Sequence, residues 1–390
     1  MLKVRHRQPL GTVACLPAPL TPATSQPSEA SSLRNHRLLS YLLAITYLSA
    51  GYQFIRYYVS YPYFYLRLPQ YFSGTERLPF QLRVLPIFIL KPLRRSYLVQ
   101  RISAARSGPL HNPDRLAFFL LSLVSFAVLC YFLVKLYRVL SLSRRLEFLL
   151  FPALFIILTW TYLLHIEQNF SYPYDLPSLA FFTAGLYYIY LRRFLPIVII
   201  LAVGTFNRET TLFLIGIYML DAASIPSELT AKWRARFDLS RIPWVRVAYL
   251  AAIWLAIKVP LALIFRFNDR SEDFLRVHDN VVRLLKPFYW PAILDLGGYL
   301  LPFVLLFRSR ILPPRFGNYL YILGPWFLII FGTGVILETR VYGELSGYLA
   351  VAVVLIIEQY IDSLLEGARH TGAKPPRLTS DLAPDINLPA

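Results

Sequence analysis

The stretch "LAFFLLSLVSFAVLCYFLVKLY", residues 116–137, decides the class of fold because it contains a single charged residue, Lys135. A helix needs about 20 consecutive, mostly apolar residues to cross the hydrocarbon core of a bilayer. Strands of a membrane barrel would instead alternate apolar and polar residues in short segments, and this run does not alternate. The run therefore predicts a membrane-spanning helix.

The rest of the chain extends this interpretation. Of its 390 residues, 56% are hydrophobic and 16% are charged, whereas a soluble domain carries about 25% charged residues. Run lengths and helix breakers predict an all-α integral membrane protein with about ten transmembrane helices. These helices are expected at residues 38–59, 116–137, 146–164, 176–191, 194–206, 210–223, 244–265, 291–307, 319–337 and 343–361.

The expected domain organisation is simple. Residues 37–362 form the polytopic membrane domain, in which residues 60–115 are a long first outer loop. Residues 1–36 and 363–390 are rich in Pro, Ser, Thr and Ala and contain no long apolar run. Such segments cannot bury a core, so both tails are expected to be disordered.

The formal net charge of +18 predicts the orientation of the chain. Lys and Arg are concentrated in alternate connecting segments, which the positive-inside rule assigns to the cytoplasm. This pattern predicts that both termini are cytoplasmic, and it explains the charge without a nucleic-acid partner. The intervening short segments 165–175, 207–209 and 338–344 hold only Arg208 and Arg340 as basic residues and are expected outside.

The first outer loop contains "LPFQLRVLPIFILKPLRRSYL", residues 78–98. Its apolar core is too short to cross a bilayer. Its basic end, with Lys91, Arg94 and Arg95, makes it amphipathic, as in helices that lie in the membrane interface. A short buried or re-entrant helix is the alternative.

This layout resembles the GT-C superfamily of membrane glycosyltransferases: a first helix, a long outer loop with interfacial helices, and shorter helices with acids at their outer ends. The resemblance covers residues 38–265. "YPYDLPSL", "FNRETTLFL" and "ETRVYGEL" also look like motifs of bacterial multi-spanning proteins grouped near that superfamily. The resemblance implies a GT-C-like fold in the bacterial inner (cytoplasmic) membrane, acting in cell-envelope chemistry.

The resemblance further implies transfer of a sugar from a polyprenyl-phosphate donor to an acceptor on the non-cytoplasmic face. Membrane lipid and the polyprenyl-phosphate sugar would then be the partners. No cofactor is implied, and participation of a divalent cation stays open. Cys15 and Cys130 are the only cysteines and provide no metal-binding set.

The family's general base is an Asp or Glu, usually in the first outer loop. In this chain Glu76 is the first acid of that loop, and Asp114 and Asp175 are the alternatives. A carboxylate screened from water can have a pKa suited to removing the proton of an acceptor hydroxyl. Arg77 and Arg83 could hold the donor phosphate, although Glu76 and Arg77 could also be an ordinary surface ion pair.

The stretch "HIEQNFSYPYDLPS", residues 165–178, supplies Glu167 and Asn169 as candidate substrate-binding residues. Asp175 precedes Leu-Pro, a pattern typical of a helix N-cap. The three aromatic residues of the stretch are expected in the interfacial belt. Helix capping and the interface thus explain much of the motif but leave Glu167 and Asn169 unexplained.

The turn "NRETT", residues 207–211, adds further candidates. Asn207 and Glu209 can be explained as the cap and the first turn of the following helix. Arg208 lies between two apolar segments and should have a carboxylate partner or a bound anion. Asp175 and Glu209 could share one outer vestibule with Arg208.

Two further motifs place charged residues near the non-cytoplasmic side of the membrane. Lys258 lies inside "AAIWLAIKVPLALIF", where a charge is costly and indicates a site. It could hold a lipid phosphate or pair with an acid. Glu338 and Arg340 of "ETRVYGE" are candidate substrate-binding residues, although an Arg340–Glu344 pair four residues apart on a helix is the simpler interpretation.

Other functions remain alternatives. A transporter or flippase of a lipid-linked or anionic substrate would need a midplane site, often built from internal repeats, and no repeat is evident. A polysaccharide polymerase or ligase would share the outer face and the lipid carrier. A non-catalytic membrane scaffold is the remaining alternative.

Overall fold

The computed structural model describes residues 29–60, 66–141, 143–164, 170–225, 237–270 and 275–370. Within these ranges the chain is helical, and its β-structure is limited to the isolated bridges Leu78–Arg270 and Ser224–Phe237. The chain divides into two compact units, residues 1–46 and 47–390. Helix α1 (Glu29–Ser60) begins in the first unit, and every later element belongs to the second.

Five helical segments in the described part of the chain are long and apolar enough to cross a membrane. The prediction of a helical, multi-pass membrane protein is confirmed in this form. Ten helices of that length are not found among the residues that the structure describes, because the short apolar runs form correspondingly short helices. The five segments are Leu38–Ser60, Pro113–Leu140, Trp244–Ile264, Pro314–Thr333 and Thr339–Gly367.

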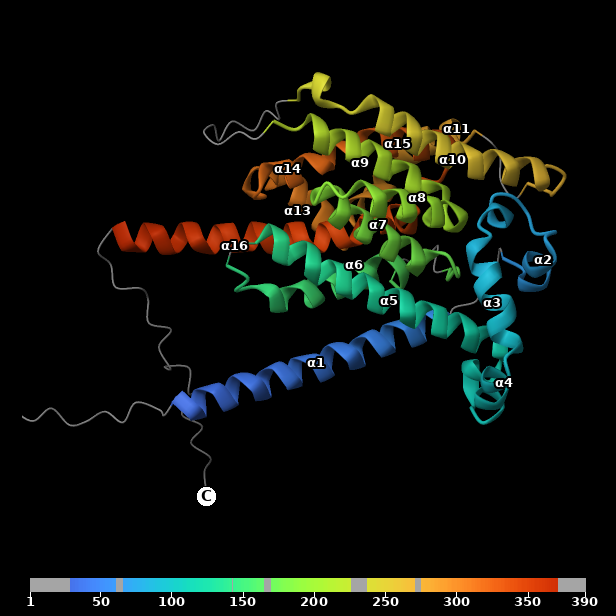
Figure 1. Ribbon diagram of the computed structural model, residues 1–390, viewed down its shortest axis with the longest axis horizontal. Helices are drawn as coiled ribbons and strands as arrows, with labels where there is room; N and C mark the ends of the chain where they lie inside the picture. The colour runs from blue at the N-terminus through green and yellow to red at the C-terminus, as the bar shows by residue number, and fades with distance from the viewer. Residues whose placement is uncertain are drawn as a thin grey trace, which may run out of the picture. The chain divides into compact units, whose positions relative to one another are not determined.

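Helix α7 (Asp175–Tyr190) is central to the larger unit. It packs against α5, α8, α9 and α16, and its residues are buried on nearly all sides. A helix that is apolar all round is expected to be enclosed in this way. Figure 1 shows α5, α7, α8 and α9 running side by side. The bounds of α7's neighbours are α5, Pro113–Leu140; α6, Leu150–Tyr162; α8, Phe194–Asn207; α9, Leu212–Ala223; and α16, Ser346–His370.

The described part of the segment predicted to be the first outer loop forms short helices. Phe88, Ile89 and Lys91 of α3 are exposed, whereas Leu90 is buried. Tyr97 and Leu98 of α4 are exposed as well. The helices of this loop are α2, Leu68–Ser73; η1, Phe80–Leu82; α3, Leu85–Arg95; α4, Tyr97–Ala104; and η2, Gly108–His111.

The predicted helix at 291–307 is broken into α12 (Trp290–Leu294) and α13 (Leu300–Leu306). Gly297, Gly298 and Tyr299 have φ angles of 62°, 66° and 62°, a left-handed conformation that glycine adopts without steric cost. A Cβ at Gly298 would also lie 2.9 Å from Cδ1 of Trp160. The glycine pair therefore interrupts a run that hydropathy alone treats as continuous.

The remaining elements connect these helices or complete the bundle. Helix α10 (Trp244–Ile264) is exposed over much of its length, and α15 (Leu323–Thr333) precedes the irregular segment before α16. Helices α1 and α16 extend to Glu29 and His370, into the segments predicted to be unstructured. The other elements are η3, Glu147–Leu149; η4, Glu209–Thr211; η5, Leu239–Arg241; α11, Val277–Leu285; η6, Pro287–Tyr289; η7, Arg308–Arg310; α14, Pro314–Gly317; η8, Asn318–Ile322; and η9, Thr339–Leu345.

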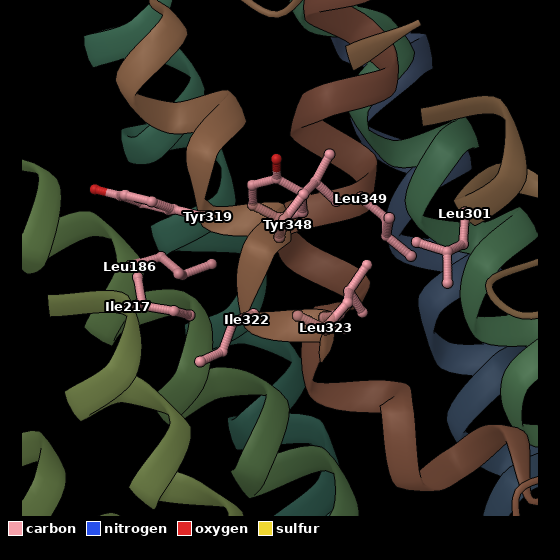
Figure 2. Close-up of a pocket in the computed structure, with 10 residues that line it drawn as sticks. Leu186, Ile217, Leu301, Tyr319, Ile322, Leu323, Tyr348 and Leu349 are labelled. Carbon is pink, nitrogen blue, oxygen red and sulfur yellow. The ribbon is translucent and has the colours of Figure 1, made fainter. Parts of the chain in front are cut away.

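A small apolar void lies in the core between α7, α9, α13, η8, α15 and α16. Figure 2 shows Leu186, Ile217 and Ile322 beside it, with the hydroxyls of Tyr319 and Tyr348 pointing away from these aliphatic side chains. Its volume is about 10 Å³, room for a single water at most, and its lining offers almost no polar partner for one. This void is a packing feature of the core and not a ligand site.

The contact between α7 and α16 provides a test of this packing. A Cβ added to Gly347 would lie 2.2 Å from Oγ1 and 3.1 Å from Cβ of the fully buried Thr183. We expect Gly347→Ala to lower the free energy of unfolding by about 1–3 kcal/mol through overpacking. Thermal and denaturant unfolding in detergent would measure the change.

Gly324→Ala is the matched control, because Gly324 is also the second residue of its helix and has no atom within 4 Å of an added Cβ. Alanine favours a helix over glycine equally at both positions. Equal stability of the two variants would show that α7 and α16 do not approach as closely as described.

Candidate functional site

Arg208 forms the centre of a buried charge cluster at the end of α8. Its Nη1 lies 3.0 Å from Oε1 of Glu344 and 3.5 Å from Oδ1 of Asp175, and the residue is 3% exposed. The hydroxyl of Thr210 also donates to Oε1 of Glu344 at 2.7 Å. The prediction that Arg208 would have a carboxylate partner is confirmed, with two carboxylates in place of one.

Asp175 and Asn207 do not cap helices, so both capping predictions are wrong. The cap position of α7 is Tyr174, and Asp175, within the helix, accepts a hydrogen bond from the Tyr58 hydroxyl at 2.9 Å. Asn207 is the last residue of α8, and its amide donates at 2.8 Å to both the Tyr174 carbonyl and Ser178 Oγ. Both side chains form buried tertiary hydrogen bonds in place of bonds to local backbone groups, and Oδ1 of Asn207 is buried without a hydrogen-bond donor among the described residues.

Glu209 belongs to a second cluster that joins the first outer loop to α10. Arg83 binds its carboxylate with two groups, Nη2 at 2.6 Å and Nε at 3.3 Å, and Nζ of Lys258 lies 3.5 Å away. Burial alone would raise the pKa of Glu209, but Arg83 and Lys258 outweigh it and hold that pKa well below its usual range. Lys258 thus has the acid partner that the sequence left open.

Stacked aromatic rings lie between Arg340 and Arg83 of the second cluster. The rings of Phe80 and Tyr172 stack at 5.5 Å, and those of Tyr172 and Tyr174 at 5.2 Å. The guanidinium of Arg340 lies 4.0 Å from the centre of the Tyr172 ring, and that of Arg83 lies 4.3 Å from the Tyr174 ring. Both tyrosines are fully buried, so the prediction that they belong to an interfacial belt is wrong.

Arg340 pairs with Glu338 and not with Glu344. The predicted Arg340–Glu344 pair assumed an α-helix, but residues 339–345 form the 3₁₀ helix η9. With three residues per turn, positions i and i+4 no longer share a face. Glu344 faces Arg208 instead.

These charged groups border a cavity of about 380 Å³, within the range of small-molecule sites. Arg83, Arg208 and Arg340 line it together with the carboxylates of Glu209 and Glu338, and apolar residues form most of the remaining wall. Within the described residues, Nε of Arg208 and Nη1 of Arg340 are buried without a hydrogen-bond acceptor. The three guanidinium groups outnumber the two carboxylates at the cavity wall, so the cavity can accept an anionic group beside an apolar or aromatic one.

The other predicted site residues are placed elsewhere. Glu76 is fully buried, and its carboxylate accepts hydrogen bonds from the backbone N–H groups of Arg67 at 2.6 Å and Arg77 at 2.9 Å. Asp114 is bound by Arg94 at 3.0 and 3.2 Å. None of these residues lines the cavity. Glu167 and Asn169 lie outside the described residues.

Trp254 and Phe80 also line the cavity, and neither was predicted as a site residue from the sequence. The indole N–H of Trp254 donates to the Glu209 carbonyl at 3.2 Å. Trp254 lies four residues before Lys258, so both occupy one face of α10. That spacing is a signal that the sequence did contain. Phe80 carries no comparable signal, because its position depends on the fold of the outer loop.

The fold and the site together define a helical membrane protein with a cation- and aromatic-lined cavity. No group of three His, Cys, Asp or Glu side chains that could hold a metal ion occurs in the part of the chain that the structure describes. No family model, curated protein or solved structure matches the chain.

The cluster around Arg208 predicts a large effect of removing its charge. Arg208→Met would leave Asp175 and Glu344 buried without their shared cation. Breaking a buried pair in this way costs about 3–5 kcal/mol. We expect that loss in the free energy of unfolding, measured by denaturant titration in detergent.

Arg138→Met is the control, because Arg138 pairs with Glu147 with about half of its side chain exposed (48%). Exposed pairs contribute little to stability, so this variant should unfold nearly like the wild type. Similar losses in the two variants would mean that Arg208 is not the buried centre of the cluster.

Proposed function

We propose that the protein is a membrane glycosyltransferase that transfers a sugar from a polyprenyl-phosphate donor to an acceptor hydroxyl in this cavity. The observation that carries the proposal is the convergence of Arg83, Arg208 and Arg340 on one largely apolar cavity bordered by two carboxylates. Fixed cations in a water-poor site stabilise charge that develops on a leaving phosphate. The apolar and aromatic wall suits a sugar face and the first part of a lipid chain.

The chemistry can be written for the groups that border the cavity. The acceptor oxygen forms a bond to the anomeric carbon, and the bond from that carbon to the phosphate oxygen breaks. The electron pair leaves with the phosphate, which the arginines bind, and the acceptor proton passes to a carboxylate. Glu338 is assigned as that base because it pairs with one cation, Arg340, whereas Glu209 is held by two, Arg83 and Lys258, which lower its pKa and make it the weaker base.

The acidic residues that the sequence predicted as the general base have other roles here. The carboxylate of Glu76 accepts hydrogen bonds from two backbone N–H groups, and Glu76 does not border the cavity. We assign Glu76 a structural role, stabilising the fold of the outer loop. Asp175 lies behind Arg208 and positions it. Asp114 binds Arg94 and is assigned to the junction between α3 and α5.

The topology remains part of the proposal. We retain a GT-C-like arrangement of about ten crossings, some by short or tilted helices, in a bacterial inner membrane with both termini cytoplasmic. The cavity supports it, because the lining segments around Arg83, Arg208 and Glu338 come from loops that the charge pattern assigns to the outside. A site on that face suits a polyprenyl-phosphate donor and an acceptor outside the cytoplasm.

One observation favours a second function, transport or flipping of a lipid-linked or anionic substrate. Each carboxylate bordering the cavity is already paired with an arginine, so the site could bind an anion without performing chemistry. A polysaccharide polymerase or ligase would use the same cavity with a different acceptor. Whether the donor bond breaks separates the enzyme from the transporter.

The test uses the full-length protein in nanodiscs with a radiolabelled polyprenyl-phosphate sugar, alone and with solubilised envelope acceptors. We expect the wild type to release polyprenyl phosphate and to form a labelled product. Glu338→Gln should lower kcat by about 10²–10⁴-fold, the usual contribution of a general base, with little change in KM. Arg340→Gln should lower kcat and also weaken binding of the donor.

Glu147→Gln is the matched control, because Glu147 also pairs with an arginine but does not line the cavity. Its kcat should equal that of the wild type. Undiminished transfer by Glu338→Gln would remove this residue from the role of base. Donor binding by the wild type without release of polyprenyl phosphate would favour the transporter.

A further inference from the structure

Helices α3 and α4 each bury one face and leave the opposite face exposed. Leu90 of α3 and Val99 of α4 are buried. On the exposed faces, Phe88 of α3 is 69% exposed and Tyr97 of α4 is 76% exposed, with Leu98 beside it at 65%. The two helices pack against each other and against α5, so both exposed faces belong to one fixed unit.

Cations share these exposed faces with the aromatic rings. Lys91 and Arg95 follow Phe88 by three and seven residues in α3. Arg101 follows Tyr97 by four residues in α4. These spacings place each cation on the same face of its helix as the ring. All three cations are exposed, and none forms an ion pair within the described part of the chain.

The charge of this segment has one sign. Residues 85–111 contain Lys91 and four arginines but neither Asp nor Glu. Arg94 is balanced from outside the segment, because it binds Asp114 at 3.0 and 3.2 Å. The other cations are left to face solvent beside the exposed apolar side chains. Such a surface is complementary to one that is both anionic and apolar, as the headgroup layer of an anionic bilayer is.

The packing on α5 places α3 and α4 at the level of a membrane surface. Helix α5 is a candidate membrane span of 28 residues, about 42 Å long at 1.5 Å per residue. A bilayer with its headgroups is about 40–45 Å thick, so the ends of α5 reach the headgroup layers. Asp114, which binds Arg94 of α3, is in the first turn of α5. Figure 1 shows α3 and α4 beside that end of α5.

We propose that the exposed faces of α3 and α4 bind anionic phospholipids at the membrane surface. The aromatic rings and Leu98 enter the interfacial layer, and Lys91, Arg95 and Arg101 contact the lipid phosphates. This inference does not depend on the proposed reaction. It bears on the cavity nevertheless, because Arg83 of the cavity wall lies two residues before the start of α3. Lipid bound to α3 would therefore hold the segment that supplies one of the cavity's cations.

The experiment places a bimane fluorophore at Leu98→Cys in the full-length protein, with Cys15 and Cys130 replaced by alanine. The protein is reconstituted in phosphatidylcholine vesicles that contain a small fraction of one nitroxide-labelled lipid, either phosphatidylglycerol or phosphatidylcholine. A nitroxide quenches the fluorophore only at short range, so quenching reports lipid beside position 98. We expect both lipids to quench, and labelled phosphatidylglycerol to quench several-fold more efficiently than labelled phosphatidylcholine at the same fraction.

Replacing Lys91, Arg95 and Arg101 together by glutamine should abolish the preference for phosphatidylglycerol and leave quenching by phosphatidylcholine unchanged. The matched control replaces three exposed arginines on other elements by glutamine, and its preference should equal that of the wild type. These control residues are Arg193, Arg246 and Arg310.

Three results would overturn the proposal. Quenching at position 98 by aqueous iodide but by neither lipid would mean that the surface faces water or a soluble acidic partner. Equal quenching by the two lipids in the wild type would overturn recognition of anionic headgroups. Equal loss of the preference in both triple variants would show that total charge, and not the exposed faces of α3 and α4, attracts the lipid.

Discussion

Neutralisation of Arg208 inside the helical bundle is the constraint on which much of the structure depends. A buried guanidinium without partners would be prohibitively costly, so Asp175 and Glu344 must lie within ion-pair distance of it. These residues stand at the start of α7, the end of α8 and the segment leading into α16. The hydroxyl of Tyr58 in α1 also binds Asp175. One charge therefore fixes where several helix ends meet, and helix ends that meet leave unpaired backbone and polar groups available to a ligand.

The ion pair between Arg83 and Glu209 fixes the position of the outer loop in the same way. It joins residue 83 to the turn after α8, while Lys258 adds α10 to the contact. Glu76 stabilises the conformation of the loop, because its carboxylate accepts hydrogen bonds from the backbone N–H groups of Arg67 and Arg77. The cavity is bordered by Arg83 and Glu209 of this cluster and by Arg208, and Tyr172 and Tyr174 stack between Arg340 and Arg83. Its charge is thus arranged before any ligand arrives, which is the condition for effective electrostatic stabilisation.

The sequence predicted helix positions well where a long apolar run is bounded by clear breakers, as at residues 116–137. It was less informative where the run is short or contains glycine. The pair Gly297–Gly298 breaks one predicted helix, because both residues take left-handed backbone angles against Trp160 and Leu349. Helix α11 was not predicted, because hydropathy does not separate an amphipathic nine-residue segment from a polar loop. Its orientation comes from Asn280, whose partners lie more than fifty residues away along the chain.

The sequence by itself determined the helical membrane class, and it drew attention to Arg83, Arg208, Glu209, Lys258, Glu338 and Arg340, which the structure brings together. Composition and run length suffice to predict the membrane class. The cost of placing charge near apolar segments suffices to single out these residues. Only the tertiary structure decided which acid each cation meets. Arg340 pairs with Glu338 and not with Glu344, since residues four apart do not share a face of the 3₁₀ helix η9. Asp175 pairs with Arg208, since the start of α7 meets the end of α8. These ion pairs depend on how each helix is rotated and on how loops bring together residues that are far apart in the sequence. The spacing of residues within one segment determines neither.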